Sequence, residues 1–380
     1  MKGQRLKSID IIKGIAIVMI VLVHFNRLFS TNITVMRFGQ MGCQMFFVVS
    51  GFGVAQSFER KFASFSFRKA TFSFYESRIK SIAPAYHLMM VIVYLVNTVA
   101  IAFTGSALDF GYNRDPLAIL CNVFFLHGLV PSANNNVMFG GWYIGTTMLM
   151  YGITPLLFHL FERFKHHRKL VCAVLSTMSV AVLAAASKLF PQYAANLLDN
   201  NSFGYFSICT QLPCFGMGML LYFEHNKEDR EQHPIMGLIA GSGVLMAAFV
   251  LFFRPIIPYA YLADASLVGL ATYFILKYMI HYETSHTYPA WTGVLTAFGT
   301  KSFFIYLTHP FVVYTCVDFA KTSLGQMNIN ADSYAGYFLL LVISLPLSYL
   351  LGCIYQKWIS GMMNFITRYC KKSEIGLFVP

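Results

Sequence analysis

Charged residues are scarce in this 380-residue chain, and acidic residues are scarcer than basic ones. Asp, Glu, Lys and Arg together make up 12% of the sequence, against roughly 25% in ordinary soluble domains. A soluble fold of this length has too much surface to cover with so few charges. The scarcity therefore excludes a soluble globular enzyme, a disordered protein and a disulfide-stapled secreted domain.

Sequence motifs of metal, redox and nucleotide chemistry are missing as well. The eight cysteines are scattered, mostly within apolar segments, and none forms a C-x-x-C pair. Neither a zinc site nor a redox motif is therefore predicted. The chain contains no Walker loop, G-x-G-x-x-G, H-E-x-x-H or G-x-S-x-G. We predict no metal and no nucleic-acid partner.

Apolar segments of about 20 residues recur along the chain. Hydrophobic residues make up 57% of the sequence, and the mean hydropathy is +0.58. Segments of this length are typical of membrane-spanning helices, whereas strands of a membrane barrel would alternate. We predict an all-α polytopic membrane protein with about ten spans, near residues 9–29, 39–58, 82–104, 142–161, 170–190, 203–223, 235–253, 261–281, 293–317 and 334–358.

The distribution of Lys and Arg predicts how these spans are oriented. With the N-terminus inside and the short apolar stretch 117–131 not crossing, 19 of the 28 basic residues fall on inner segments and 5 on outer ones. If 117–131 crossed, the basic run 162–169 would face outward, against the positive-inside rule. We therefore expect both termini in the cytoplasm and a long outer excursion at 105–141, partly re-entrant or interfacial and functional in character.

The sequence has no internal repeat and no low-complexity linker. We expect one integral membrane domain over residues 1–380. Its tail, about 359–380, is expected in the cytoplasm, and no soluble second domain is expected after the last span.

Ionisable residues inside spans are candidates for function. Lys13 and His24 are 11 residues apart in the first span, which places both on one helix face about 16 Å apart along the axis. The pair suggests a long ligand that is charged at one end and reactive at the other. Alternatively, Lys13 reaches the lipid headgroups and His24 is a core histidine. Asp10, one turn before Lys13, is its expected ion-pair partner.

Four further residues are candidates for helix packing or cofactor binding towards the cytoplasmic face. Ser50 and Gly51 permit close approach of a neighbouring helix, which is first of all a packing signal. The basic segment 59–81 either lies on anionic lipid or binds the phosphates of a cytosolic cofactor. Arg78 and Lys80, which adjoin the third span, are best placed for the second role.

The outer side has its own candidates. The excursion ends in an Asn- and Gly-rich stretch that includes Asn135, where irregular backbone and amide hydrogen bonds are expected. Trp142 and its neighbour Tyr143 belong either to an aromatic belt at the interface or to a surface that stacks on a sugar. His309 is a second outer-half histidine if the ninth span runs outward.

These motifs, taken in order, resemble those of acyltransferase family 3, a family of integral membrane proteins. A basic residue is followed by Gly-Ile-Ala and, eleven residues on, by histidine, at Lys13–His24. Phe-Phe-x-x-Ser-Gly-Phe is present at Phe46–Phe52, and a version of Arg-x-x-Arg-Ile-x-Pro at Arg78–Pro84. The later motifs match at Trp142, Thr147, Tyr151 and Pro155, and at Ser302, Tyr306, Leu307 and His309.

The resemblance covers about residues 5–315, and three positions depart from the family pattern. Lys13 replaces an Arg, which keeps the charge but loses the planar fork. Ser81 replaces a second Arg, with Lys80 beside it as a substitute. Thr147 stands where many members carry Glu, so an acid–base role is not expected there.

The resemblance implies transfer of an acyl group, usually acetyl from cytosolic acetyl-CoA, to a hydroxyl of an extracytoplasmic glycan or lipid-linked saccharide. It implies a multi-pass protein of a bacterial inner membrane. In this scheme Lys13, Arg78, Lys80 and Ser50 bind acetyl-CoA, and His24 is the general base. The acceptor contacts the residues predicted on the outer side, namely Asn135, Trp142, Tyr151 and His309.

Two other classes of function remain open at this level. A transporter or flippase of glycan or glycolipid also needs polar residues in a central cavity, although the chain lacks the repeats and paired broken helices typical of one. A non-catalytic membrane scaffold would leave the aligned Lys13 and His24 without a role. The sequence does not identify the acceptor, the acyl chain or the oligomeric state.

Overall fold

The computed structural model describes residues 5–30, 33–108, 111–189, 202–225, 234–254, 260–327 and 329–376, and these residues form helices and loops without a β-strand. The helices of the first half are α1 (Lys7–Asn26), η1 (Thr34–Met41), α2 (Gly42–Phe62), α3 (Phe67–Thr104), α4 (Pro116–Val123), η2 (Leu126–Gly128), η3 (Pro131–Ala133), α5 (Gly141–Arg163) and α6 (Arg168–Leu189). Those of the second half are α8 (Phe203–Phe206), α9 (Ile208–His225), α10 (Pro234–Phe253), α11 (Ala260–Glu283), α12 (Thr292–Phe311), η4 (Val312–Val317), α13 (Asp318–Gln326) and α14 (Tyr334–Gly376).

Within the described residues, ten helical segments are long and apolar enough to cross a membrane. They correspond one to one with the ten predicted spans. The stretch 117–131 forms the eight-residue helix α4 and two single 3-10 turns. At about 1.5 Å per residue, α4 is far shorter than the roughly 30 Å of a bilayer core. The prediction of a helical bundle in which this stretch does not cross is confirmed.

Two helices extend beyond the spans that the sequence predicts for them. The third span was expected to begin at residue 82, but α3 begins at Phe67, so the predicted loop 59–81 shrinks to residues 63–66. Likewise α14 continues to Gly376, and the expected tail from 359 is helical that far. In both places the residues between the predicted and the observed boundary include no proline, so nothing breaks the backbone hydrogen bonding.

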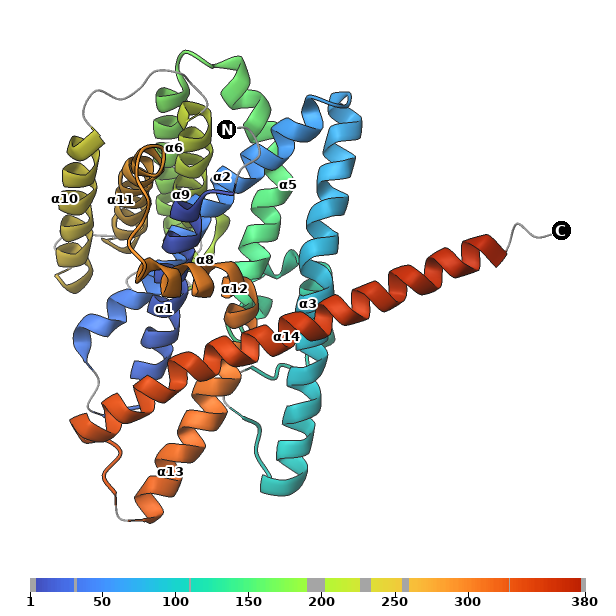
Figure 1. Ribbon diagram of the computed structural model, residues 1–380, viewed down its shortest axis with the longest axis vertical. Helices are drawn as coiled ribbons and strands as arrows, with labels where there is room; N and C mark the ends of the chain where they lie inside the picture. Colours follow the sequence, from blue (N-terminus) through green and yellow to red (C-terminus); the bar gives the residue numbers. More distant parts are fainter. Residues whose placement is uncertain are drawn as a thin grey trace.

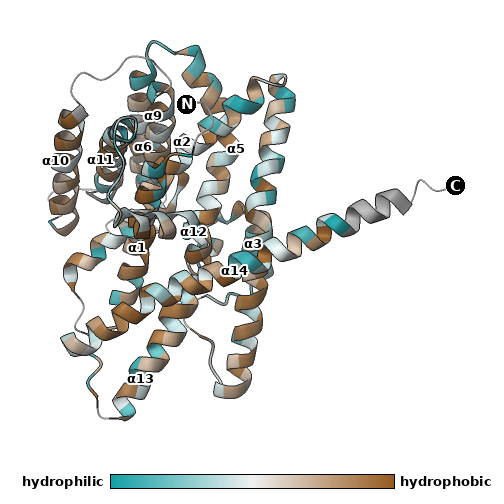
Figure 2. Cartoon of the chain, viewed as in Figure 1, coloured by the Kyte–Doolittle hydropathy of each residue, from teal (hydrophilic) through white to brown (hydrophobic). Residues whose placement is uncertain are grey.

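The helices lie roughly side by side, apart from the long α14, which crosses the bundle obliquely (Figure 1). The α2–α3 and α5–α6 connections lie at one end of the molecule, and the α13–α14 connection lies at the other. Polar colour gathers at the first end, and apolar colour covers the outward side of α10 and much of α14 (Figure 2). Exposed residues of α14, such as Val342 at 68% and Trp358 at 65%, face where lipid would lie.

Glycines determine which helices meet most closely. A Cβ atom at Gly299 of α12 would lie 1.8 Å from the Asp10 carbonyl oxygen of α1, and one at Gly14 would lie 2.0 Å from the Leu295 oxygen. Only glycine permits this backbone contact. The same holds between α2 and α9, where a Cβ at Gly51 would lie 2.1 Å from the Phe215 oxygen. The predicted close approach at Gly51 is confirmed.

The described residues 111–141 of the excursion form a folded segment held by a buried polar network. Asp115 caps α4 by accepting hydrogen bonds from the amides of Leu117 and Ala118. His127 is fully buried, and its Nε2 lies 2.9 Å from the Gly141 carbonyl oxygen. The ring of Tyr86 from α3 stacks on His127 at 5.8 Å. The network joins the excursion to α3 and to the first turn of α5.

Candidate functional site

Two histidines from distant parts of the chain meet between α1 and α12. The rings of His24 and His309 have their centroids 5.2 Å apart. Gly14 and Gly299 explain the meeting, because each lies ten residues before its histidine and the two glycines mark the closest contact of the helices. Ten residues of helix rise about 15 Å. The two side chains therefore arrive at the same level along adjacent helices.

The Tyr314 hydroxyl is a third member of this cluster. It lies 3.2 Å from Nδ1 of His24. Tyr314 stands in η4, a π-helical segment that directly follows α12 and Pro310. Such segments often occur at functional sites. With Nδ1 engaged, the other ring nitrogen of His24 makes no hydrogen bond among the described residues, so it is available to a ligand.

His309 is almost fully buried, at 1% exposed, yet only half of its hydrogen-bonding capacity is used. Its Nδ1 lies 2.8 Å from the Tyr306 carbonyl oxygen. Since a carbonyl can only accept, Nδ1 carries the proton and Nε2 of the neutral ring has a lone pair. That Nε2 is buried and has no hydrogen-bond partner within the described part of the chain. A buried acceptor without a partner costs free energy unless a ligand donor reaches it.

The end of the excursion covers the histidine pair. The Phe139 ring contacts His24 edge-on, with centroids 4.9 Å apart. The Tyr306 hydroxyl donates to the Gly140 carbonyl oxygen at 2.7 Å. Asn135 holds this turn through its side-chain oxygen, which accepts from the Gly140 amide at 2.9 Å. Asn135 is therefore close to the site but acts on the backbone that carries Phe139.

Trp142 is placed differently from either predicted role. It is 7% exposed, and its ring stacks on Phe206 with centroids 4.6 Å apart. The ring of Phe47 packs against it as well. Trp142 is a core residue in this structure, and the faces that a sugar or an interface would need are occupied by other aromatic rings.

On the cationic half of the site, Lys13 is half-buried and has no ion pair among the described residues. The expected pairing with Asp10 is wrong, because Asp10 pairs with Arg5 instead, at 2.6 Å from Nε and 3.1 Å from Nη2. This double contact suits the planar fork of an Arg better than a Lys ammonium. Within the described residues, Lys13 is thus left without a carboxylate partner.

Arg78 is a second cation without a carboxylate among the described residues. Its Nη2 donates to the Ser57 hydroxyl of α2 at 3.2 Å, and its Nε is buried without a partner. The guanidinium lies over the ring of Tyr151, 5.8 Å from the centroid. Tyr151 was predicted on the acceptor side, but the structure places it beside Arg78, on α5 nine residues below Trp142.

Lys80 lies apart from Arg78. Its ammonium pairs with Glu76 at 2.6 Å, and its side chain is 69% exposed. Residues two apart in a helix point about 200° apart, so Lys80 and Arg78 cannot face one ligand from the same helix turn. The structure does not bring this predicted pair together.

Ser50 lies on α2, one turn after Phe47. The Phe47 ring packs on Tyr143 with centroids 4.9 Å apart, and the Tyr143 ring packs on Tyr306 at 5.1 Å. Ser50 and Ser57 are seven residues apart, which places them on one face of α2 about 10 Å apart. The face of α2 that carries Ser57, which contacts Arg78, therefore also carries Ser50.

Tyr314, Phe139 and Asp264 are further residues of interest that no sequence motif marks. Asp264 of α11 is 2% exposed, and its Oδ1 has no hydrogen-bond partner among the described residues. A carboxyl in an apolar span was a detectable signal. Tyr314 and Phe139 carried none, since only the packing of distant segments brings them to His24.

Comparison with known proteins identifies the family of the chain. A family model for an acyltransferase domain, that of acyltransferase family 3, matches residues 6–353. No curated protein and no solved structure matches the chain significantly. The match covers nearly the whole chain, including both histidines, Lys13 and Arg78. The chain therefore belongs to acyltransferase family 3 and is a multi-pass membrane O-acyltransferase.

Proposed function

We propose that the protein transfers an acetyl group from cytosolic acetyl-CoA to a hydroxyl of an extracytoplasmic glycan or lipid-linked saccharide, in a bacterial inner membrane. The observation that carries the proposal is the His24–His309 pair, with one engaged nitrogen on each ring and a buried, unpartnered Nε2 on His309. This arrangement offers a base to one hydroxyl and an acceptor to a second.

The two cations without carboxylate partners support an anionic donor. Lys13 and Arg78 would bind the phosphates of acetyl-CoA, because each carries a charge that no described acid neutralises. The pantetheine arm would pass along the shared face of α1 and α2, towards His24. Ser50 would border this path, on the face of α2 that also carries Ser57.

In the chemical step, the acceptor hydroxyl oxygen attacks the thioester carbonyl carbon. Nε2 of His24 takes the hydroxyl proton, the carbon–sulfur bond breaks, and the same proton passes to the departing thiolate. The products are an ester and CoA. For His24 to act through Nε2, its Nδ1 must carry a proton, which it donates to the Tyr314 hydroxyl.

His309 would serve the acceptor rather than the proton transfer. Its free Nε2 would accept a hydrogen bond from a neighbouring hydroxyl of the same saccharide. Phe139 and the turn held by Asn135 would cover the reacting atoms and exclude water, which would otherwise hydrolyse the thioester.

The test uses the purified full chain in proteoliposomes with acetyl-CoA and a crude glycolipid extract. The proposal predicts acceptor-dependent release of CoA by the wild type and none above background by His24→Gln. Lys80→Ala is the control, because Lys80 lies outside the site and should release CoA normally. Glycolipid movement across the bilayer without any dependence on acetyl-CoA would replace the proposal with transport.

A further inference from the structure

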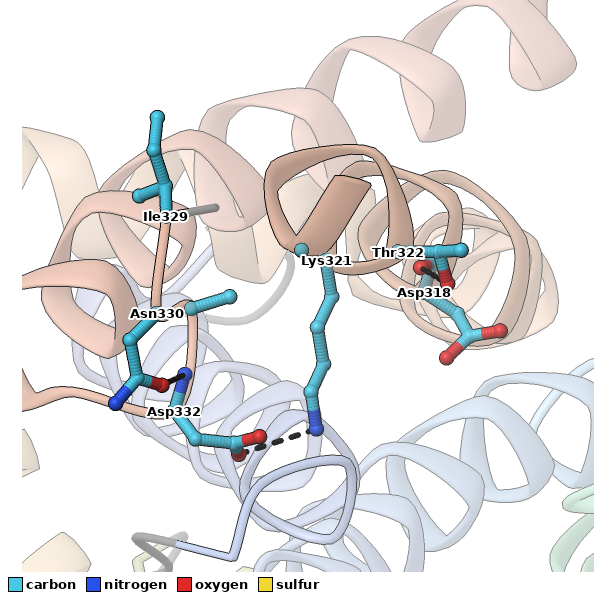
Figure 3. Close-up of a pocket in the computed structure, with 8 residues that line it drawn as sticks. Asp318, Lys321, Thr322, Ile329, Asn330 and Asp332 are labelled. Carbon is cyan, nitrogen blue, oxygen red and sulfur yellow. Dashed lines mark hydrogen bonds and ion pairs between the residues drawn. The ribbon is translucent and has the colours of Figure 1, made fainter. Parts of the chain in front are cut away.

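A pocket of about 430 Å³ lies between α13 and the segment that precedes α14. Its volume falls within the usual range for small-ligand sites. Figure 3 shows Lys321 reaching down between two groups of side chains. Asp318 and Thr322 lie on one side of it, and Asn330 and Asp332 lie on the other.

Two residues that line the pocket, Lys321 and Asp332, are hydrogen-bonded to the backbone just after α1. The Lys321 ammonium donates to the Leu28 carbonyl oxygen at 2.6 Å and pairs with Asp332 at 3.1 Å. Asp332 also accepts from the Ser30 amide at 2.9 Å. Although partial burial opposes it, these contacts hold the pKa of the Asp332 carboxyl below its usual range. The pocket therefore sits at a fixed position relative to the helix that carries His24.

Three groups in the pocket remain available to a ligand. Asp318 is exposed and makes no side-chain hydrogen bond among the described residues. The Thr322 hydroxyl donates to the Asp318 backbone oxygen at 3.0 Å, so its lone pairs are open. The Asn330 side-chain oxygen accepts from the Asp332 amide at 3.0 Å, which leaves its NH₂ group. A carboxylate, a hydroxyl and an amide match the donors and acceptors of sugar hydroxyls.

The charges indicate which ligand this pocket would take. Asp318, Lys321 and Asp332 together carry one net negative charge, and the only cation is already engaged by Asp332 and the Leu28 oxygen. A phosphate or a uronic acid would be repelled here. The Lys321 ammonium beside Asp332 likewise disfavours a divalent cation. An uncharged, hydroxyl-rich group fits best.

The pocket and the histidine cluster are connected by one continuous helical segment, which contains both Tyr314 and Asp318. Tyr314, which contacts His24, is four residues before Asp318, or about 6 Å of helix rise. Asp318, Thr322 and Gly325 lie on one helix face. A Cβ at Gly325 would meet nothing within 4 Å, so this face has open space.

We propose that the pocket between α13 and residues 329–332 is a subsite for an uncharged saccharide unit, adjoining the unit that is acylated at His24. This inference rests on the proposed function for the identity of the ligand as part of the acceptor. The subsite would bind the glycan away from the reacting hydroxyl. It would therefore contribute to acceptor affinity and not to the chemical step.

Binding to the detergent-purified full chain tests the subsite without requiring turnover. The probes are two uncharged trisaccharides, maltotriose and chitotriose, and the anionic tri-galacturonic acid, followed by saturation-transfer NMR. We expect an uncharged probe to bind better than the anionic one, and Asp318→Asn to weaken that binding about tenfold through loss of a charged hydrogen bond. His24→Gln should bind like the wild type.

Thr322→Val and Thr104→Val form a matched pair, since both threonines are exposed and donate to the carbonyl four residues earlier. Only Thr322→Val should weaken binding. The proposal is overturned if no uncharged probe binds the folded wild type, if the anionic probe binds best, or if the pocket variants bind unchanged. Pocket-dependent binding without any CoA release would instead refute the acyl transfer and leave the subsite standing.

Discussion

The two halves of the site differ in how their polar groups are satisfied. In the histidine half, His24 of α1 contacts both the ring of His309 from α12 and the hydroxyl of Tyr314 from η4. Around Lys13 and Arg78, the cations lie on separate helices and no described carboxylate neutralises either. The histidine half is held together by its own contacts, and under the proposed function an anionic donor would supply the missing partner of the cationic half.

This difference corresponds to two kinds of task. Chemistry requires groups held within a fraction of an ångström, which the glycine contacts between α1 and α12 provide. Binding an anion requires charge that is not already paired. Substitutions in the two halves should therefore change different kinetic constants, and the following predictions separate them.

The largest effect is expected at His24. His24→Gln removes the proposed base while keeping a polar side chain of similar reach. The rate of transfer at saturating substrates should fall by about 10²–10⁴-fold, the usual contribution of general base catalysis. Acetyl-CoA affinity, measured by equilibrium binding, should not change. A weakened donor affinity with a normal rate would place His24 in the binding half.

A change at Arg78 should have the opposite signature. Arg78→Ala should raise the KM for acetyl-CoA by about tenfold to a hundredfold, because a hydrogen bond to a charged group contributes about 1.5–3 kcal/mol. The kcat should change little. Lys80→Ala is the matched control on the same helix, and its KM should equal that of the wild type. Equal effects of the two variants would contradict the assignment of Arg78.

Removal of the Tyr314 hydroxyl tests whether its contact with His24 contributes to catalysis. Tyr314→Phe keeps the ring that packs beside Phe139 but removes the partner of His24 Nδ1. The kcat should fall by about tenfold at most, the range of a single neutral hydrogen bond. The pH at which the kcat is half-maximal should move, since the tyrosine oxygen no longer stabilises protonated His24. An unchanged pH profile would assign Tyr314 a packing role.

The smallest expected effect is on the stability of the excursion, residues 111–141, whose end packs over the histidine pair. Burial lowers the pKa of His127, partly offset by the carbonyl oxygens of Gly141 and Cys121. The folded excursion therefore favours the neutral ring, and its stability should fall as the pH drops below about 6.5 towards the lowered value. Hydrogen exchange of residues 111–141 should be faster near pH 5 than near pH 7 after correction for intrinsic rates.

In His127→Gln this pH dependence should disappear, because the titrating ring is gone. Substitution of the exposed His166 by Gln should leave it intact. If the excursion of wild type exchanges equally at both pH values, the buried imidazole does not control its stability.

Much of this fold could be predicted from local properties of the sequence. Span length and Lys/Arg placement located ten helices, because both are properties of a short stretch of chain. The alignment of Lys13 with His24 followed from helical periodicity in the same way. The separation of Arg78 and Lys80 was predictable by that same periodicity.

The remaining features depended on contacts between segments far apart in the chain. Trp142 is buried because Phe206, 64 residues later, covers its ring. His309 reaches His24 because Gly14 and Gly299 allow two helices to touch. No local pattern reports such choices.

The central claim is that His24 transfers a proton during acetylation of an acceptor on the far side of the membrane. The most direct test supplies radiolabelled acetyl-CoA to the cytoplasmic face of sealed vesicles that contain the full chain and a lipid-linked glycan. The account predicts an alkali-labile acetyl label on the glycan with the wild type and none above background with His24→Gln. Equal labelling by the two proteins would contradict it.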